Sequence, residues 1–335
     1  MRAIRALSPG SADVLSFDEL ADPRPGPGQV TVAVEAAGVN FIDVYHRQGI
    51  YPVDYPRVLG TEGAGTVLAV ADGVTEAAVG DRVAWAGGSE GSYATAAVVD
   101  ASQLVPVPDD VPTDVAAAVM LQGLTAHALA TGVFPVEPGQ DVLVHAGAGG
   151  VGLLLTQIAV ARGARVITTV SSEAKEATSR AAGAADVIRY DKLTDLTAEL
   201  PARVRELTGG LGVHSVFDGV GRSTFDASLA SLRPRGGLAL FGGASGQVPP
   251  VDPQRLNRAG SVYLTRPSVW DYSTPREALL ERSAELFALV SSGALDVAIS
   301  ARYPLADAAA AHRALEARTT TGKTLLIPPH PRPSS

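Results

Sequence analysis

The chain has 335 residues, of which 46% are hydrophobic and 19% charged, enough to bury the cores of two domains. Its net charge of −8 disfavours general binding to nucleic acid or anionic membranes, since both need a basic surface. The absence of cysteine excludes disulfides, thiolate nucleophiles and thiolate metal ligands. The start of the chain lacks a signal-peptide pattern, and no apolar run approaches the roughly 18 residues that span a bilayer, so we expect a cytoplasmic protein.

Residues 1–123 show short strand patterns separated by glycine and proline, with candidates at 30–34, 63–70, 80–85 and 91–99. Short strands with frequent turn residues are typical of a small β or barrel-like domain. We therefore expect a first domain of this kind over residues 1–123.

Residues 124–266 alternate strand candidates with helical stretches. The strand candidates lie at 141–145, 165–170, 186–189, 213–218, 238–242 and 261–265. Helices are expected at 150–162, at 275–292, and around Phe225, Leu229 and Leu232, which share one helical face. Six strands with crossovers predict an α/β fold with a doubly wound parallel sheet. Residues 267–328 are expected to return to the first domain, and the proline-rich residues 329–335 to form a disordered tail.

A glycine-rich segment joins the first of these strands to its helix. Gly147, Gly149 and Gly152 form a G-x-G-x-x-G pattern between strand and helix, the context in which this pattern indicates a dinucleotide site. The first glycine permits the turn, the second lets a pyrophosphate approach, and the third lets helix and strand pack closely. The phosphates would bind the free N–H groups at the helix N-terminus.

The end of the next strand indicates which dinucleotide is bound. NAD-binding units carry an acidic residue here for the ribose 2′-hydroxyl, whereas this chain has Ser171 and Ser172, followed by Lys175. Two hydroxyls and an ammonium favour a 2′-phosphate and hence NADPH, although Glu173 weakens the argument. Alternatively, Ser171 caps the following helix and Lys175 is solvated.

The chain resembles the zinc-independent medium-chain dehydrogenase/reductases, most closely the NADPH:quinone oxidoreductases of the zeta-crystallin type. The matching stretches are Ala37–Asp43, Gly49–Pro52, Leu59–Gly65, Gly80–Val83, Gly123–Thr125, His145–Gly152, Ala182–Ala184, Phe241–Gly242, Thr265–Pro267 and Gly322–Lys323. The resemblance implies a GroES-like β domain built from both chain ends and a Rossmann domain between them, with the active site in the cleft.

Zinc-dependent relatives carry metal ligands where this chain has Asn40, Thr61 and Gln122, which bind zinc poorly. Glu62 alone cannot complete a site, and the six histidines lack ligand spacing, so we expect no metal. Hydride transfer to a conjugated acceptor, such as a quinone or an α,β-unsaturated carbonyl, needs no strong Lewis acid.

The resemblance also implies residue roles. The catalytic candidates are Asn40, Tyr51 and Arg266. The cofactor-binding candidates are Asn40, Gly147, Gly149, Gly150, Val151, Gly152, Ser171, Lys175, Tyr190, Gly219, Phe241, Gly242 and Arg318. Purely structural alternatives are that Asn40 closes a turn, that Tyr51 packs beside Pro52, and that Arg318 is a surface charge.

Three functions remain open at this point. The first is NADPH-dependent quinone reduction, and the second is enoyl or 2-alkenal reduction on the same scaffold. The third is a non-catalytic NADPH-binding structural protein. The resemblance further implies a homodimer, for which the strand at 261–265 is a candidate edge.

Overall fold

The computed structural model describes residues 1–89 and 91–329, and the chain divides into two compact units. Unit 1 comprises Met1–Leu124 and Thr274–Ser335, and unit 2 comprises Thr125–Ser273. The second division thus falls after Ser273, whereas the sequence placed it at residue 267. Of the tail expected at 329–335, residues 330–335 lie outside the described part of the chain.

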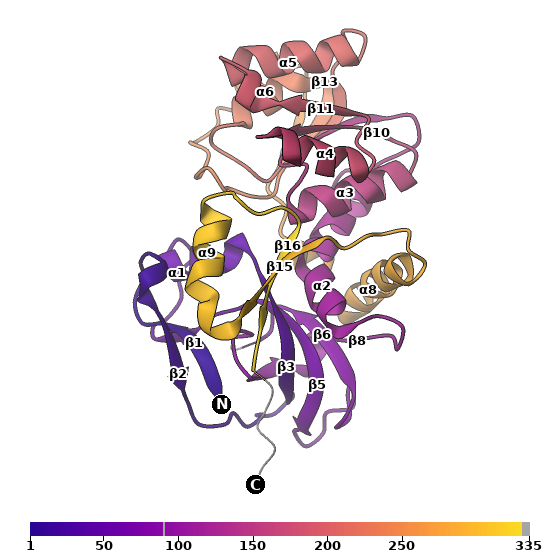
Figure 1. The fold of residues 1–335 in the computed structure, drawn as a ribbon. Coiled ribbons are helices and arrows are strands. Elements are labelled where there is room, and N and C mark those ends of the chain that lie inside the picture. Colours follow the sequence, from indigo (N-terminus) through magenta and orange to yellow (C-terminus); the bar gives the residue numbers. More distant parts are fainter. Residues whose placement is uncertain (90, 330–335) are drawn as a thin grey trace. The chain divides into compact units, whose positions relative to one another are not determined.

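Unit 1 contains two sheets (Figure 1). The larger has the order β15-β16-β3-β5-β6-β8, with β7 also paired to β3. Its strands are β3 (Gln29–Val39), β5 (Glu62–Val70), β6 (Arg82–Ala86), β7 (Ala96–Asp100), β8 (Leu104–Pro106), β15 (Ile299–Pro304) and β16 (Lys323–Ile327). The smaller sheet has the order β2-β1-β4, from β1 (Arg2–Ala6), β2 (Leu15–Glu19) and β4 (Arg57–Val58). Valines at alternate positions of β3 (Val30, Val32 and Val34) pack with the fully buried Trp85 in the core.

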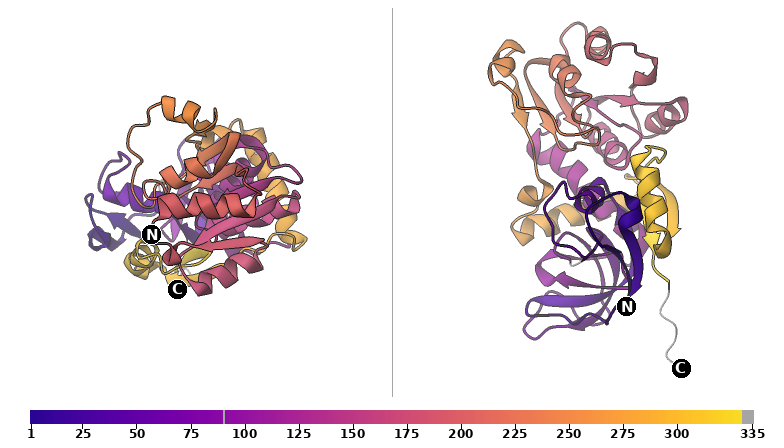
Figure 2. Two further views of the ribbon diagram at one scale, coloured as in Figure 1. Left: turned by 90° about the horizontal axis from the view of Figure 1, so that it is seen from above. Right: turned by 90° about the vertical axis from the view of Figure 1, so that its left-hand side faces the viewer.

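Both chain ends contribute to unit 1. Strand β16 pairs antiparallel with β3, so that Thr324 lies opposite Val39. Helix α9 (Ala308–Glu316) packs against the short helix η1 (Ala12–Val14) near the N-terminus, as the adjacent indigo and yellow segments of Figures 1 and 2 show. The larger sheet is therefore complete only when residues beyond 320 are in place.

Unit 1 contains three further helices, α1 (Phe41–Gln48), α2 (Thr113–Ala128) and α8 (Arg276–Ser291), of which α2 continues beyond Leu124 into the segment of unit 2. Helix α2 and the π-helical turn η3 (Leu129–Val133) form an apolar segment of 21 residues. By length and composition alone this segment could cross a membrane, which the sequence analysis did not anticipate. Since 72% of its most apolar window is buried inside the protein, it has the surroundings of a core helix.

Unit 2 contains a six-stranded parallel sheet with the order β11-β10-β9-β12-β13-β14. The strands are β9 (Asp141–Val144), β10 (Arg165–Val170), β11 (Asp186–Arg189), β12 (Val213–Asp218), β13 (Leu232–Leu240) and β14 (Tyr263–Thr265). Numbered within the unit, the order is 3-2-1-4-5-6, that of the Rossmann fold. The expected fold class is confirmed.

Helices connect the parallel strands of unit 2 (Figure 1). They are α3 (Gly150–Ala161), α4 (Glu173–Ala181), α5 (Leu196–Leu207), α6 (Phe225–Ser231) and α7 (Gln254–Arg258). The expectation that Leu232 lies on the same helix as Phe225 and Leu229 is wrong. Helix α6 ends at Ser231, and Leu232 adopts extended backbone angles and begins β13. Pro234, two residues further on, cannot supply a helical N–H.

Candidate functional site

The candidate cofactor residues of unit 2 follow the carboxyl ends of its strands. Gly147 to Gly152 follow β9, Ser171 follows β10 and Tyr190 follows β11. Gly219 follows β12, Phe241 and Gly242 follow β13, and Arg266 follows β14. Because all six strands are parallel, these ends share one edge of the sheet, with β9 and β12 adjacent where the strand order reverses. Ligands of doubly wound sheets bind at this position.

The three loop positions carry glycine for different reasons. A Cβ on Gly147 would lie 2.5 Å from the Cβ of Thr168 and 2.8 Å from the Ser179 hydroxyl, and one on Gly152 would overlap the Ala146 carbonyl. A Cβ on Gly149 would meet only the Ala146 carbonyl oxygen at 3.2 Å and the Ala146 Cβ at 3.9 Å. Packing within unit 2 therefore accounts for Gly147 and Gly152, whereas a Cβ on Gly149 would meet only the loop's own Ala146, which leaves space beside the loop.

The N-terminus of α3 offers donors beside that space. Gly149 is the N-cap and provides no side-chain cap. The first backbone bond of the helix runs from the Leu153 N–H to the Gly149 carbonyl at 2.9 Å. The amides of Gly150, Val151 and Gly152 precede this bond and have no helical acceptor. Such amides, with the helix dipole behind them, suit an anionic ligand.

After β10, helix α4 is capped by a serine other than Ser171, which the sequence offered as the cap. Ser172, rather than Ser171, caps α4, by accepting a hydrogen bond from the Lys175 N–H at 3.4 Å. The Glu173 carboxylate, 92% exposed, lies 3.7 Å from Arg189. Ser171 and Lys175 are half-buried. The Ser171 hydroxyl is thus not consumed by capping, and Glu173 lies beside a cation.

Sequence reasoning missed Arg189 at this end of the sheet. In the parallel pairing of β10 and β11, Arg189 lies opposite Val170, directly before the two serines. Its guanidinium forms two hydrogen bonds to Asp191, at 2.7 and 3.1 Å, which raise its pKa further. The available signal was its position as the last residue of the third predicted strand.

Further along the same sheet edge, the residues that follow β12 and β13 pack closely against each other. A Cβ on Gly219 would lie 2.8 Å from the Phe241 ring, and one on Gly242 would overlap the Gly219 carbonyl. Arg266 donates from Nη1 to the Leu240 carbonyl at 2.8 Å. The backbone and Arg266 thus form one packed group at the carboxyl ends of β13 and β14.

A buried polar network surrounds His145, two residues before the glycine loop begins at Gly147. His145 Nε2 lies 2.9 Å from the Ser228 hydroxyl, which donates to Asp218 at 2.7 Å. His145 Nδ1 lies 2.9 Å from the Thr169 hydroxyl, and burial lowers the pKa of His145. These bonds connect β9, β10, β12 and α6, so that strand ends bordering the candidate site are held together.

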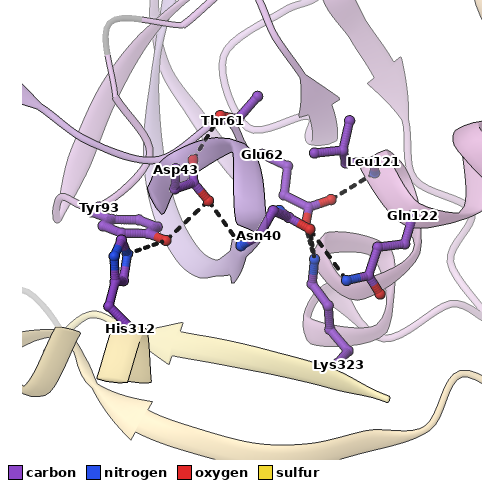
Figure 3. Close-up of polar contacts among 9 residues, drawn as sticks. All are labelled: Asn40, Asp43, Thr61, Glu62, Tyr93, Leu121, Gln122, His312 and Lys323. Carbon is purple, nitrogen blue, oxygen red and sulfur yellow. Dashed lines mark hydrogen bonds and ion pairs between the residues drawn. The ribbon is translucent and has the colours of Figure 1, made fainter. Parts of the chain in front are cut away.

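Unit 1 contains a second buried cluster around the Asn40 side chain (Figure 3). Asn40 Nδ2 donates to Glu62 Oε1 at 2.7 Å, and Asn40 Oδ1 accepts from Lys323 Nζ at 2.9 Å and from Gln122 Nε2 at 3.2 Å. Glu62 is fully buried, forms an ion pair with Lys323, and accepts from the Leu121 N–H at 2.6 Å. Burial lowers the pKa of Lys323, and the Asp43 carboxylate opposes this shift.

Asp43 forms a neighbouring network (Figure 3). Its carboxylate accepts from the Asn40 N–H at 2.9 Å, the Thr61 hydroxyl at 2.7 Å and the Tyr93 hydroxyl at 3.1 Å. Burial raises the pKa of Asp43, and these bonds oppose the increase. Tyr93 also lies 3.2 Å from His312 Nε2, and burial with the nearby Arg47 lowers the pKa of His312 to about 4. Asn40 therefore begins α1 through its backbone, while its side chain bonds elsewhere.

The three positions that carry zinc ligands in zinc-dependent relatives are all engaged in these contacts. The Thr61 hydroxyl donates to Asp43, and the Asn40 and Gln122 amides bond to each other. The Lys323 ammonium supplies the positive charge beside Glu62. Across residues 1–89 and 91–329, no group of three His, Cys, Asp or Glu side chains is arranged to hold a metal ion.

The remaining candidates are Tyr51 and Arg318, both in unit 1. The Tyr51 ring packs edge-on against Tyr45, with centroids 5.4 Å apart, and against His46 at 6.1 Å. Arg318 is exposed and has a left-handed backbone, with φ of 57°, just after α9. The structure thus gathers the candidates of unit 2 at one sheet edge, and the roles of Asn40, Tyr51 and Arg318 remain predictions.

Comparisons with known proteins place this chain in a family. Residues 26–109 match the alcohol dehydrogenase GroES-like domain, and residues 150–281 match the family described as zinc-binding dehydrogenase. A quinone oxidoreductase of Salmonella typhimurium is 44% identical, covering 95% of this chain and 97% of its own length. A 2-haloacrylate reductase of a Burkholderia species is 40% identical, covering 95% and 96%.

Solved structures agree with this placement. A mycobacterial protein solved in complex with NADPH superimposes with a TM-score of 0.95 at 53% identity, covering 98% of this chain and 100% of that chain. The similarity extends over nearly the whole length of both chains. The chain belongs to the medium-chain dehydrogenase/reductase family and, within it, to the quinone oxidoreductases.

Proposed function

We propose that this protein is an NADPH-dependent quinone reductase that works without zinc. The observation that carries the proposal is the carboxyl edge of the unit 2 sheet, where Gly149 leaves space beside an uncapped helix N-terminus. The relatives named quinone oxidoreductase support the choice of acceptor.

NADPH, when bound, supplies the hydride. We propose that the amides of Gly150, Val151 and Gly152 hold its pyrophosphate, next to the space at Gly149. Ser171, Lys175 and Tyr190 would hold the ribose with its 2′-phosphate, and Arg189 adds a guanidinium at the neighbouring strand end. Gly219, Phe241 and Gly242 would line the nicotinamide end.

The protein's contribution to the chemical step is positioning and hydrogen bonding. A quinone accepts hydride at carbon, and the negative charge that develops is delocalised to oxygen. Asn40, Tyr51 and Arg266 are the proposed donors to that oxygen, and preorganised donors of this kind typically contribute ~2–4 kcal/mol. Within the described part of the chain, Asn40 Nδ2 donates to Glu62 and keeps a second N–H for this purpose.

The test is steady-state oxidation of NADPH with a naphthoquinone, a 2-alkenal and an enoyl thioester, with ethanol and NADP⁺ as the alcohol control. We expect the highest kcat/KM with the quinone. Asn40→Ala and Tyr51→Phe should lower kcat while NADPH binding is largely kept. Turnover of the alcohol with none of the quinones or enals would reject the assignment.

A second candidate is reduction of an activated alkene, favoured by the 2-haloacrylate reductase among the relatives. A quinone and an enal both place the charge that develops on an oxygen, so the same donors serve both. A kcat/KM for the enal or thioester at least tenfold above that for the quinone would favour this candidate. Tight NADPH binding with no turnover of any acceptor would favour the non-catalytic alternative.

We further propose a cytoplasmic homodimer formed through the β14 edge. Strand β14 is the last strand of the unit 2 sheet, and its first residue, Tyr263, is 63% exposed. An exposed edge strand favours pairing with a second copy. Light scattering should give twice the 34.3 kDa chain mass, and Tyr263→Lys should shift the protein toward monomer. A monomeric wild-type protein at micromolar concentration would reject the dimer.

A further inference from the structure

The hydrogen bonds around the Asn40 amide have a fixed polarity (Figure 3). Its oxygen accepts from the Lys323 ammonium and its nitrogen donates to the Glu62 carboxylate. An ammonium has only donors and an ionised carboxylate has only acceptors. The opposite charges therefore distinguish the two ends of an amide whose ends are nearly identical in shape.

Reversing the Asn40 amide would place its oxygen against the carboxylate and its NH₂ group against the ammonium. Both contacts would be repulsive in a site where Asn40 is 6% exposed and both charged side chains are buried. Electrostatic interactions are stronger in such low-dielectric surroundings than in water. One orientation of Asn40 is thus strongly preferred.

Gln122 is oriented in turn. The Asn40 oxygen accepts from Gln122 Nε2 at 3.2 Å, so the Gln122 oxygen is directed elsewhere and is buried with no hydrogen-bond partner among the described residues. An unpaired buried acceptor is unfavourable, which indicates that bonding to Asn40 takes precedence over satisfying Gln122. The ion pair thus sets the orientation of the Asn40 amide and, through it, that of the Gln122 amide.

Stability alone is a weak reason for such an ion pair. Burying two charges costs solvation free energy, and a neutral pair of similar volume is often as stable. Lys323 and Glu62 come from strands β16 and β5, 261 positions apart in the chain, and both contact the Asn40 side chain. The feature that a neutral pair would lack is the distinction between the two ends of the Asn40 amide.

We propose that Glu62 and Lys323 are positioning residues that hold the Asn40 amide in one orientation, so that its remaining N–H is presented to the hydride acceptor. This inference rests on the proposed role of Asn40 as a hydrogen-bond donor. The ion pair itself does not contact the acceptor and acts through Asn40 alone.

The experiment compares Asn40→Ala with the double variant Glu62→Gln/Lys323→Met. The double variant removes both charges while keeping similar volumes, so its Tm should stay near that of the wild type. We expect kcat for the quinone to fall at least fivefold in both proteins, with the KM for NADPH within twofold of the wild type. A purely structural ion pair would instead give a stable double variant with full kcat.

The wild-type protein provides an independent readout. The chain has only two asparagines, Asn40 and Asn257, and Asn257 is exposed. Selective ¹⁵N-asparagine labelling therefore shows two side-chain NH₂ groups, each with a pair of proton signals, and Asn40→Ala assigns them. We expect the Asn40 protons to be widely separated in shift and to exchange with solvent far more slowly than those of Asn257.

The outcomes separate this inference from the proposed function. Full kcat in Asn40→Ala would reject the role of Asn40 itself. Low kcat in Asn40→Ala with full kcat in the double variant would reject positioning by the ion pair. If the double variant does not fold, exchange of the Asn40 amide as fast as that of Asn257 would overturn the inference, and slow exchange would support it.

Discussion

Replacing Gly149 by valine tests the phosphate site at a position where the fold does not require glycine. Gly149 has φ of −82° and ψ of 169°, extended angles that valine adopts readily. Its Cβ would contact only Ala146, at 3.2 and 3.9 Å, so the backbone needs at most a small adjustment. We therefore expect Gly149→Val to fold, with a Tm within a few degrees of the wild type.

The two added methyl groups would occupy the space proposed for the pyrophosphate. A hydrogen bond to a charged group is worth ~1.5–3 kcal/mol, and displacement of the phosphates would weaken about two such bonds. The loss of about 3–5 kcal/mol raises the Kd for NADPH by roughly 10²- to 4 × 10³-fold. Calorimetric titration measures this directly, with circular dichroism to verify folding.

Gly147→Val is the matched control at the other end of the loop. A Cβ there would lie 2.5 Å from Thr168 inside the protein, so this variant should lose stability as well as binding. NADPH binding within a few-fold of the wild type in a folded Gly149→Val protein would show that this loop does not hold the phosphates.

Three further measurements follow from the structure. Lys175→Ala should raise the KM for NADPH two- to fivefold, the effect of ~0.5–1 kcal/mol for a surface charge contact, and leave NADH unchanged; a wild-type preference for NADH in kcat/KM would contradict the proposed cofactor. Activity should survive exhaustive treatment with EDTA or phenanthroline, and stoichiometric zinc that is lost together with activity would contradict zinc independence. The pKa of His312 is about 4 in the folded state, whereas an exposed histidine has a pKa of 6.5, so the unfolded chain alone takes up its proton as the pH falls from 6.5 to 4. This lowers the unfolding free energy by about 3 kcal/mol. In urea titrations, the unfolding free energy of His312→Gln should therefore fall less between pH 6.5 and pH 4 than that of the wild type. An equal fall in the two proteins would contradict the buried neutral histidine.

The parallel sheet was predictable because its strands carry a strong signal. Strands β10 and β12 begin and end where the sequence placed them. Their buried apolar residues are β-branched or aromatic, the types enriched in strands: Val166, Ile167 and Val170 in β10, and Val213, Val216 and Phe217 in β12. Helix α2 was not predicted, because a helix that is apolar on all sides has no amphipathic pattern. Leu232 was wrongly placed on a helix because helical spacing continued into a strand that begins directly after it.

The site was predictable to the extent that it is local in the chain. The glycine loop lies within six residues, between one strand and one helix. The partners of Asn40 are far apart in the chain. The sequence indicated no contact with Asn40 for either of them: Glu62 is part of a family match and a poor metal ligand by itself, and Lys323 is part of another family match. Nothing local links residues 261 positions apart, and a charge at the start of an apolar strand was the one available signal for each.

The order in which unit 1 is assembled has a consequence for protein synthesis. Residues 125–273 of unit 2 are contiguous and can fold while the ribosome is still translating the rest, since domains generally fold as units during synthesis. Unit 1 must wait for β16, which brings both the neighbour of β3 and the cation for Glu62. A nascent chain that stalls before residue 323 would lack the strand that pairs with the Ala37–Val39 end of β3, and an unpaired strand is prone to aggregation. The buried Glu62 carboxylate would also have no counter-charge from Lys323. Until β16 has been synthesised, chaperones and proteases would therefore bind this protein chiefly at its first 124 residues.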